Sequence, residues 1–202
     1  MHISDIQIRN PVVVPEAGGY YRFGSTGKDI RKGPGTGFDG YVSSVAGRLS
    51  DFEGPFPVFR PPEDLWPAMN FWVPEIHPYQ GGWYMFATFK PRKGRRGTGI
   101  LKSTGSILGP YIPWSCSGPV TPGDWECLDG PFFMEQGIPY LVFCHEWQQA
   151  GDGGHGMLFR SVQGTLYLAL HTPNQTPWER PRFIALQEAA GKLGIAGHEE
   201  EL

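Results

Sequence analysis

The chain has 202 residues, a formal net charge of −3 and three cysteines, and it contains 29 glycines and 20 prolines. This length suits one domain with a sizeable core. Aromatic residues make up 14% of the chain, which argues against the disorder that so much glycine and proline would otherwise suggest. Aromatic and β-branched runs separated by glycine and proline predict an all-β protein with many turns.

Charge and hydropathy exclude several classes of partner. The basic cluster KPRKGRRG (90–97) lies between two strand-like runs and is typical of a hairpin loop, so no nucleic-acid partner is expected. The sequence contains no run of 18 apolar residues, so no transmembrane helix is expected. The first ten residues lack the apolar segment of a signal peptide, and an odd cysteine count gives no disulfide framework. We therefore expect a cytoplasmic protein, although a secreted protein whose signal peptide has been removed would show the same features.

Four segments repeat one layout: a polar residue, a short apolar run, a glycine-containing turn and an aromatic run. Each predicts a hairpin of two short strands. From the polar residue to the tyrosine of the second run there are 11, 9, 11 and 12 positions. The four pairs are Asn10 and Tyr21, Glu75 and Tyr84, Asp129 and Tyr140, and His155 and Tyr167.

A second hairpin follows the first two segments, at 37–59 and 96–114, so a full unit has an inner and an outer hairpin. Recurrence at this scale predicts a β-propeller. We expect a single domain over 1–202, with blade-like units at about 8–60, 70–120, 123–150 and 154–190. The third unit is partial because CHEWQQAGDG (144–153) runs directly into the fourth.

In a propeller the first strand of each blade lines the central axis, so the polar residues at those strand starts are expected to converge. Glu75 lies in the apolar stretch FWVPEIH, and desolvation raises the pKa of a carboxylic acid, as a general acid requires. Together with Asp129 it could divide the acid and base work of glycosidic cleavage. The alternatives are a turn role for Asp129, which precedes a glycine, and four unrelated polar strand ends in a β-sandwich.

The stretches FWVPEIH, DWECLDGPFF, YLVFCHEW and GHGMLFRSVQGTLYLALHTPN resemble glycoside hydrolase family 43, the five-bladed β-propeller glycosidases, from about Ile3 to Leu186. The resemblance implies an all-β propeller of that type, incomplete or rearranged between its third and last blades. It also implies a carbohydrate substrate, such as an arabinofuranoside or xyloside of plant type, and hydrolysis with inversion.

Residue roles follow from the same resemblance. Glu75 matches the general acid, Asp129 matches the residue that tunes this acid, and the base position falls on Asn10, where the family usually has aspartate. An amide cannot accept a proton at neutral pH, and general-base assistance is typically worth about 10² to 10⁴ in rate. His155 matches a histidine that helps to hold a water-bound calcium ion near the axis, and no other cofactor is expected.

Further substrate-binding candidates flank these positions. Alternation along a strand places His77 on the same face as Glu75. His145 and Glu146 could contact sugar hydroxyls or simply end a strand. Trp72 and Trp147 could stack on sugar rings or pack between blades.

Compared with the family, the chain lacks a segment between CHEWQQAGDG and GHGMLF. This segment would contain the outer half of the third blade and the whole fourth blade, which is roughly one and a half blades, or about 60 to 80 residues. Its absence would expose strand edges, so association with further copies of the chain is expected through these edges. We predict a glycosidase impaired by Asn10. The alternatives are a catalytically inactive glycan-binding propeller and a structural β-protein without a glycan site. The last residues, 186–202, are predicted to form a short helix-prone tail.

Overall fold

A computed structural model describes residues 1–45, 48–114, 117–135, 137–142, 144–145, 157–172, 177–189 and 192–196. Within these ranges the chain is built of β-strands, with one short 3₁₀ helix, η1 (Ile3–Asp5). No helix in the described ranges is long and apolar enough to span a membrane.

Three antiparallel sheets have four strands each, in chain order. The first contains β1 (Arg9–Glu16), β2 (Gly19–Ser25), β3 (Phe38–Ser43) and β4 (Phe52–Phe59). The second contains β5 (Pro67–Tyr79), β6 (Gly82–Pro91), β7 (Gly97–Ser106) and β8 (Gly109–Pro113). The last contains β13 (Met157–Arg160), β14 (Leu166–Thr172), β15 (Arg180–Ala189) and β16 (Lys192–Ile195).

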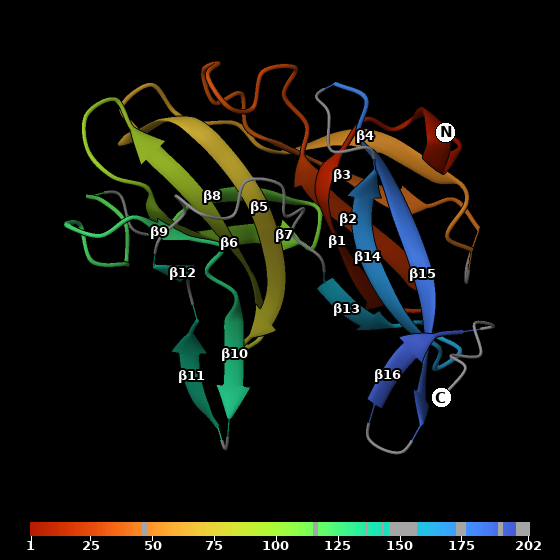
Figure 1. Cartoon of the computed structure of the whole chain (residues 1–202). Helices are drawn as coiled ribbons and strands as arrows, with labels where there is room; N and C mark the ends of the chain where they lie inside the picture. The colour runs from red at the N-terminus through yellow and green to blue at the C-terminus, as the bar shows by residue number, and fades with distance from the viewer. Residues whose placement is uncertain are drawn as a thin grey trace.

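The third unit is a single hairpin. Its strands are β9 (Cys127–Leu128), β10 (Phe132–Glu135), β11 (Ile138–Leu141) and β12 (Cys144–His145). The pairs β9–β12 and β10–β11 are two stretches of the same hairpin, and its tip projects away from the other sheets (Figure 1). No outer hairpin accompanies it in the part of the chain that the structure describes.

Apolar faces of neighbouring sheets form the core. One cluster joins the first and second sheets and includes Phe38, Phe59 and Phe89. A second cluster joins the first sheet to the last and includes Tyr20, Phe52 and Phe159. The first sheet therefore lies between the second and the last, as Figure 1 shows.

Blades of four antiparallel strands, packed face to face in chain order, confirm the predicted all-β propeller, which is incomplete in its third unit. The helical tail was a wrong prediction. β15 extends to Ala189 and pairs with β16, from Leu186 opposite Ile195 to Ala189 opposite Lys192. Helix-favouring residues such as those at 186–189 form a strand here because β14 offers β15 a paired edge, which outweighs a weak local preference.

Candidate active site

One position in each of the first three inner hairpins has an unusual backbone conformation. The φ angles of Asn10, Val73 and Asp129 are 51°, 49° and 50°. This left-handed region is uncommon for any residue except glycine and is a clear outlier for β-branched valine. Such conformations persist only where the surroundings enforce them, and they concentrate at functional sites.

Each of these three inner hairpins has a one-residue bulge at this left-handed residue. The ladder shifts between Arg9 and Val12 in β1 and between Trp72 and Glu75 in β5. In the third hairpin Leu128 pairs with Cys144 and Phe132 pairs with Leu141, which is the same one-residue change. Bulges redirect side chains and are enriched beside active sites.

The register shows which residues of the blades are equivalent. The tyrosine of each inner hairpin pairs with the residue four positions after the left-handed one: Tyr21 with Val14, Tyr84 with His77, and Tyr140 with Phe133. Val73 is therefore the counterpart of Asn10 and Asp129, and Glu75 lies two residues further along its strand. This explains why the spacing measured from Glu75 was 9 positions instead of 11.

Hydroxyl groups connect the three bulges. The backbone N–H of Val73 donates to Ser25 Oγ over 3.1 Å, and Ser25 pairs with Arg9 beside Asn10. In the same way the N–H of Asp129 donates to Thr88 Oγ1 over 2.9 Å, and Thr88 pairs with Trp72. The second strand of the first blade thus holds the bulge of the second, and the second strand of the second blade holds the bulge of the third. This repeated contact brings the three bulges side by side.

Glu75 is paired with a histidine and almost completely buried. Its residue exposure is 7%, and its Oε2 lies 3.2 Å from Nε2 of His77, which shares its strand face. The ring of His77 packs against Phe86 of the same blade and Phe132 of the third hairpin. The carboxyl group is therefore held by a side chain that is itself fixed between two aromatic rings.

A buried ion pair adjoins Asn10. Arg9 Nη1 lies 3.1 Å from Oε1 of Glu179, whose side chain is fully buried. The backbone carbonyl of Glu179 also accepts from the N–H of Ile8 over 3.3 Å. The last blade thereby fixes the entrance to β1. The sequence analysis did not predict this ion pair. The available signal was that each charged residue lies two positions before a proline, in RNP and in ERP.

Trp72 is a packing residue by its geometry. It is 9% exposed, and its indole N–H donates to the carbonyl of Ile30. The guanidinium of Arg96 lies 5.1 Å from its ring centroid and forms an ion pair with Glu126 at 3.1 Å. These contacts favour the packing alternative over sugar stacking for this tryptophan.

The turn at Asp129 depends on the glycine that follows it. A Cβ atom added to Gly130 would lie 2.4 Å from Oγ1 of Thr98 in β7. Only glycine therefore allows the chain to approach the second blade this closely, and the approach sets the position of Asp129.

Several predicted site residues lie beyond this description. Glu146, Trp147 and His155 fall outside the described residues, and for His145 only the backbone is described, paired with Cys127. Within the described ranges no three His, Cys, Asp or Glu side chains are grouped to hold a metal ion.

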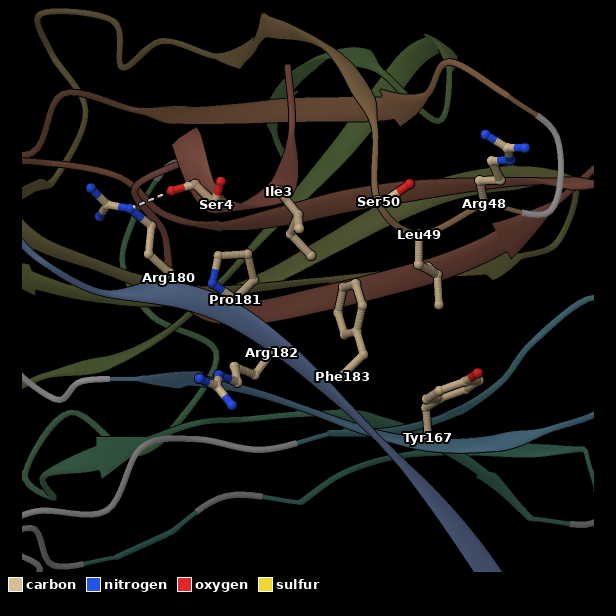
Figure 2. A pocket seen from close by; sticks show the side chains of 10 residues that line it. All are labelled: Ile3, Ser4, Arg48, Leu49, Ser50, Tyr167, Arg180, Pro181, Arg182 and Phe183. Atoms are coloured by element: carbon tan, nitrogen blue, oxygen red, sulfur yellow. Dashed lines mark hydrogen bonds between the residues drawn. The ribbon is translucent and has the colours of Figure 1, made fainter. Parts of the chain in front are cut away.

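A separate cavity of about 920 Å³ lies where the first and last sheets meet, and Figure 2 shows its lining. Leu49, Phe183 and Tyr167 contribute apolar surface, and Arg180 donates to the backbone carbonyl of Ser4 over 2.9 Å. None of the three left-handed residues lines it. This cavity belongs to the junction of the sheets and is distinct from the predicted acidic site.

These features define an incomplete β-propeller with Asn10 and Asp129 at matching bulges and Glu75 two residues beyond the third bulge position, Val73. The family model "Glycosyl hydrolases family 43" matches residues 3–154. The chain therefore belongs to glycosyl hydrolase family 43.

Solved structures share the fold. An endo-arabinase from Bacteroides thetaiotaomicron VPI-5482 is 20% identical, with a TM-score of 0.79 over 95% of this chain and 98% of that chain. A thermostable family-43 glycoside hydrolase is 15% identical, with a TM-score of 0.72 over 95% and 93%. An endo-1,4-beta-xylanase from Bacteroides thetaiotaomicron is 14% identical, with a TM-score of 0.68 over 96% and 95%. No curated protein matches the sequence.

Proposed function

We propose that this protein hydrolyses O-glycosidic bonds of plant-type glycans that contain arabinofuranose or xylose. Family membership supports the reaction class, and the names of two similar structures, an endo-arabinase and an endo-1,4-beta-xylanase, support the sugars. The repeated bulge is the observation that supports the site most strongly. It presents Asn10 and Asp129 at matching positions, with Glu75 on the blade between them.

The reaction proposed is a single displacement with inversion. Glu75, in its protonated form, donates a proton to the glycosidic oxygen as the bond to the anomeric carbon breaks. His77 positions the carboxyl group, and Asp129 tunes its acidity from the next blade. A water molecule attacks the opposite face of the sugar, and its proton must pass to a base. No step requires a metal ion.

Asn10 occupies the proposed base position and cannot take that proton. We expect hydrolysis to be slower by about 10² to 10⁴ than with a carboxylate at this position. If glycans bind without any turnover, the chain is a catalytically inactive glycan-binding propeller.

Product stereochemistry and acid removal test the proposal together. Aryl arabinofuranosides and xylosides would be hydrolysed inside an NMR tube, and the first anomer formed would be recorded. Inversion is expected, and Glu75→Gln should lower kcat by at least about 10². The matched control is Glu63→Gln, an exposed carboxylate in the loop between β4 and β5, which should leave kcat unchanged. A retained configuration, or full activity in Glu75→Gln, would contradict these roles.

A further inference from the structure

The third hairpin lacks the neighbouring strand that the complete blades have. In the first two sheets the inner-hairpin tyrosine is the first residue of the second strand to pair with the third strand, with Tyr21 opposite Val42 and Tyr84 opposite Lys102. Tyr140 is the counterpart of these tyrosines by register. Within the described residues β11 pairs with β10 alone, and no described strand lies along its other edge from Tyr140 onward.

From Tyr140 onward this edge lacks the protection found on the outer strands of the complete sheets. Proteins protect sheet edges against association with proline and charged residues. β4 contains Glu53, Pro55 and Pro57, β8 contains Pro110 and Pro113, and β16 begins with Lys192. The segment 140–142 (YLV) has neither a charge nor a proline, and Pro139 precedes the stretch that a third strand would pair.

A cavity lies beside the hairpin, next to the edge that has no described neighbouring strand. A cavity of about 460 Å³ lies between the second blade and the hairpin, lined by side chains that include Tyr84, Lys102 and Trp114 on one side and Leu141 on the other. Trp114 is 59% exposed. On the hairpin, Phe133, Ile138, Tyr140 and Val142 are between 43% and 55% exposed. Outer strands of the third blade would cover this part of the second blade.

We propose that a second copy of this chain supplies the missing strand, by antiparallel pairing of β11 with its symmetry mate across a two-fold axis. Two hairpins of two strands would then form one composite blade of four strands, the number found in the complete sheets. A second copy suits the edge because the same open, uncharged segment is present in each chain, so no like charges oppose each other.

The backbone fixes the register of this pairing. The N–H of Val142 donates to the carbonyl of Pro131 over 3.0 Å inside the hairpin, so the N–H and C=O of Leu141 point to the open edge. A two-fold axis at Leu141 lets the two leucines exchange both backbone hydrogen bonds. It also places Tyr140 of each copy opposite Val142 of the other, and aromatic and β-branched residues form favourable cross-strand pairs.

Light scattering coupled to size exclusion tests the proposal on the full chain at high micromolar concentration. The expected mass is twice the monomer mass of 22.4 kDa. Leu141→Pro removes the outward N–H without affecting a hydrogen bond of the hairpin and should give the monomer mass. Tyr140→Lys is the second test if the proline variant does not fold. It brings two positive charges close together across the proposed pairing and should also give the monomer mass. The control Ile112→Lys, on the exposed edge strand β8, should remain dimeric.

Hydrogen exchange adds an independent readout, since the Leu141 amide should be protected in the dimer and exchange faster on dilution. A monomeric wild-type chain would overturn the proposal. It would also be overturned by a dimer that survives in folded Leu141→Pro or Tyr140→Lys, or by open-ended larger assemblies. Glycosidase activity plays no part in any of these outcomes.

Discussion

Replacing Arg22 by methionine should stabilise the protein. Arg22 in β2 is fully buried, and among the described residues none accepts a hydrogen bond from its three guanidinium nitrogens. It lies over the rings of Tyr41, at 4.9 Å, and Phe52, at 4.3 Å. Burial lowers the pKa of Arg22 from its usual range to about 9, because the charged form is poorly solvated.

The pKa change gives the size of the effect. At about 1.4 kcal/mol for each tenfold change in an ionisation constant, the buried charge costs roughly 5 kcal/mol. The contacts of the guanidinium with the two aromatic rings stabilise the folded state by about 1 to 2 kcal/mol each. Methionine would keep an unbranched apolar chain in the same space. We expect Arg22→Met to raise the free energy of unfolding by about 2 kcal/mol, in line with other replacements of buried charges. For a chain of this size that is about 4 to 8 °C in Tm.

Urea denaturation followed by circular dichroism at neutral pH would measure the change. Arg9→Met is the matched control. It should destabilise the protein by about 3 to 5 kcal/mol, because it removes the ion-pair partner of the buried carboxylate of Glu179. The pH dependence has a definite sign. Above pH 9 the unfolded chain keeps the Arg22 proton that the folded chain releases, so wild-type stability rises with pH and the advantage of Arg22→Met shrinks. A loss of stability in Arg22→Met at neutral pH would refute the reasoning.

Three further substitutions test the packing of the strand starts, each by thermal or urea unfolding. Thr88→Ala removes the acceptor for a backbone N–H in the next blade and should cost about 1 to 3 kcal/mol, whereas Thr88→Ser should cost much less; equal losses would contradict the hydrogen bond. Gly130→Ala should lower stability by more than about 1 kcal/mol, because its Cβ has no room, while Gly123→Ala, in open space, should be nearly neutral. Glu179→Gln should destabilise by about 3 kcal/mol by leaving Arg9 unpaired, and an unchanged Tm would show that this ion pair is dispensable.

The fold was largely predictable because the inner hairpins repeat a simple pattern. Turn glycines, alternating aromatic runs and a regular tyrosine position are local features, and the structure pairs each tyrosine at the same register. The incomplete third unit was also visible, as a spacing too short for an outer hairpin. β16 was missed because the segment just before it, 186–189, favours helix locally, and β16 forms a strand only when β15 is present as a neighbour.

The candidate site was harder to predict in detail. The sequence pattern aligned Glu75 with Asn10 and Asp129 because all three are polar, whereas the backbone aligns Val73 with them. Proline was the better guide, since Pro11 and Pro74 each follow the left-handed residue directly. The contacts of Ser25, Thr88 and Glu179 join segments far apart in the chain, and no local pattern identifies such partners.

Activity of Asn10→Asp on aryl arabinofuranoside, xyloside and galactofuranoside substrates tests the proposed site most directly. The wild-type chain and the control Gln80→Glu, which places a new carboxylate at the exposed turn after β5, would be assayed beside it. We expect Asn10→Asp to gain at least about 10² in kcat on one of these substrates, with no gain in the control. Undiminished glycosidase activity in the wild-type chain, or a folded Asn10→Asp variant with no activity at all, would contradict the placement of the base at residue 10.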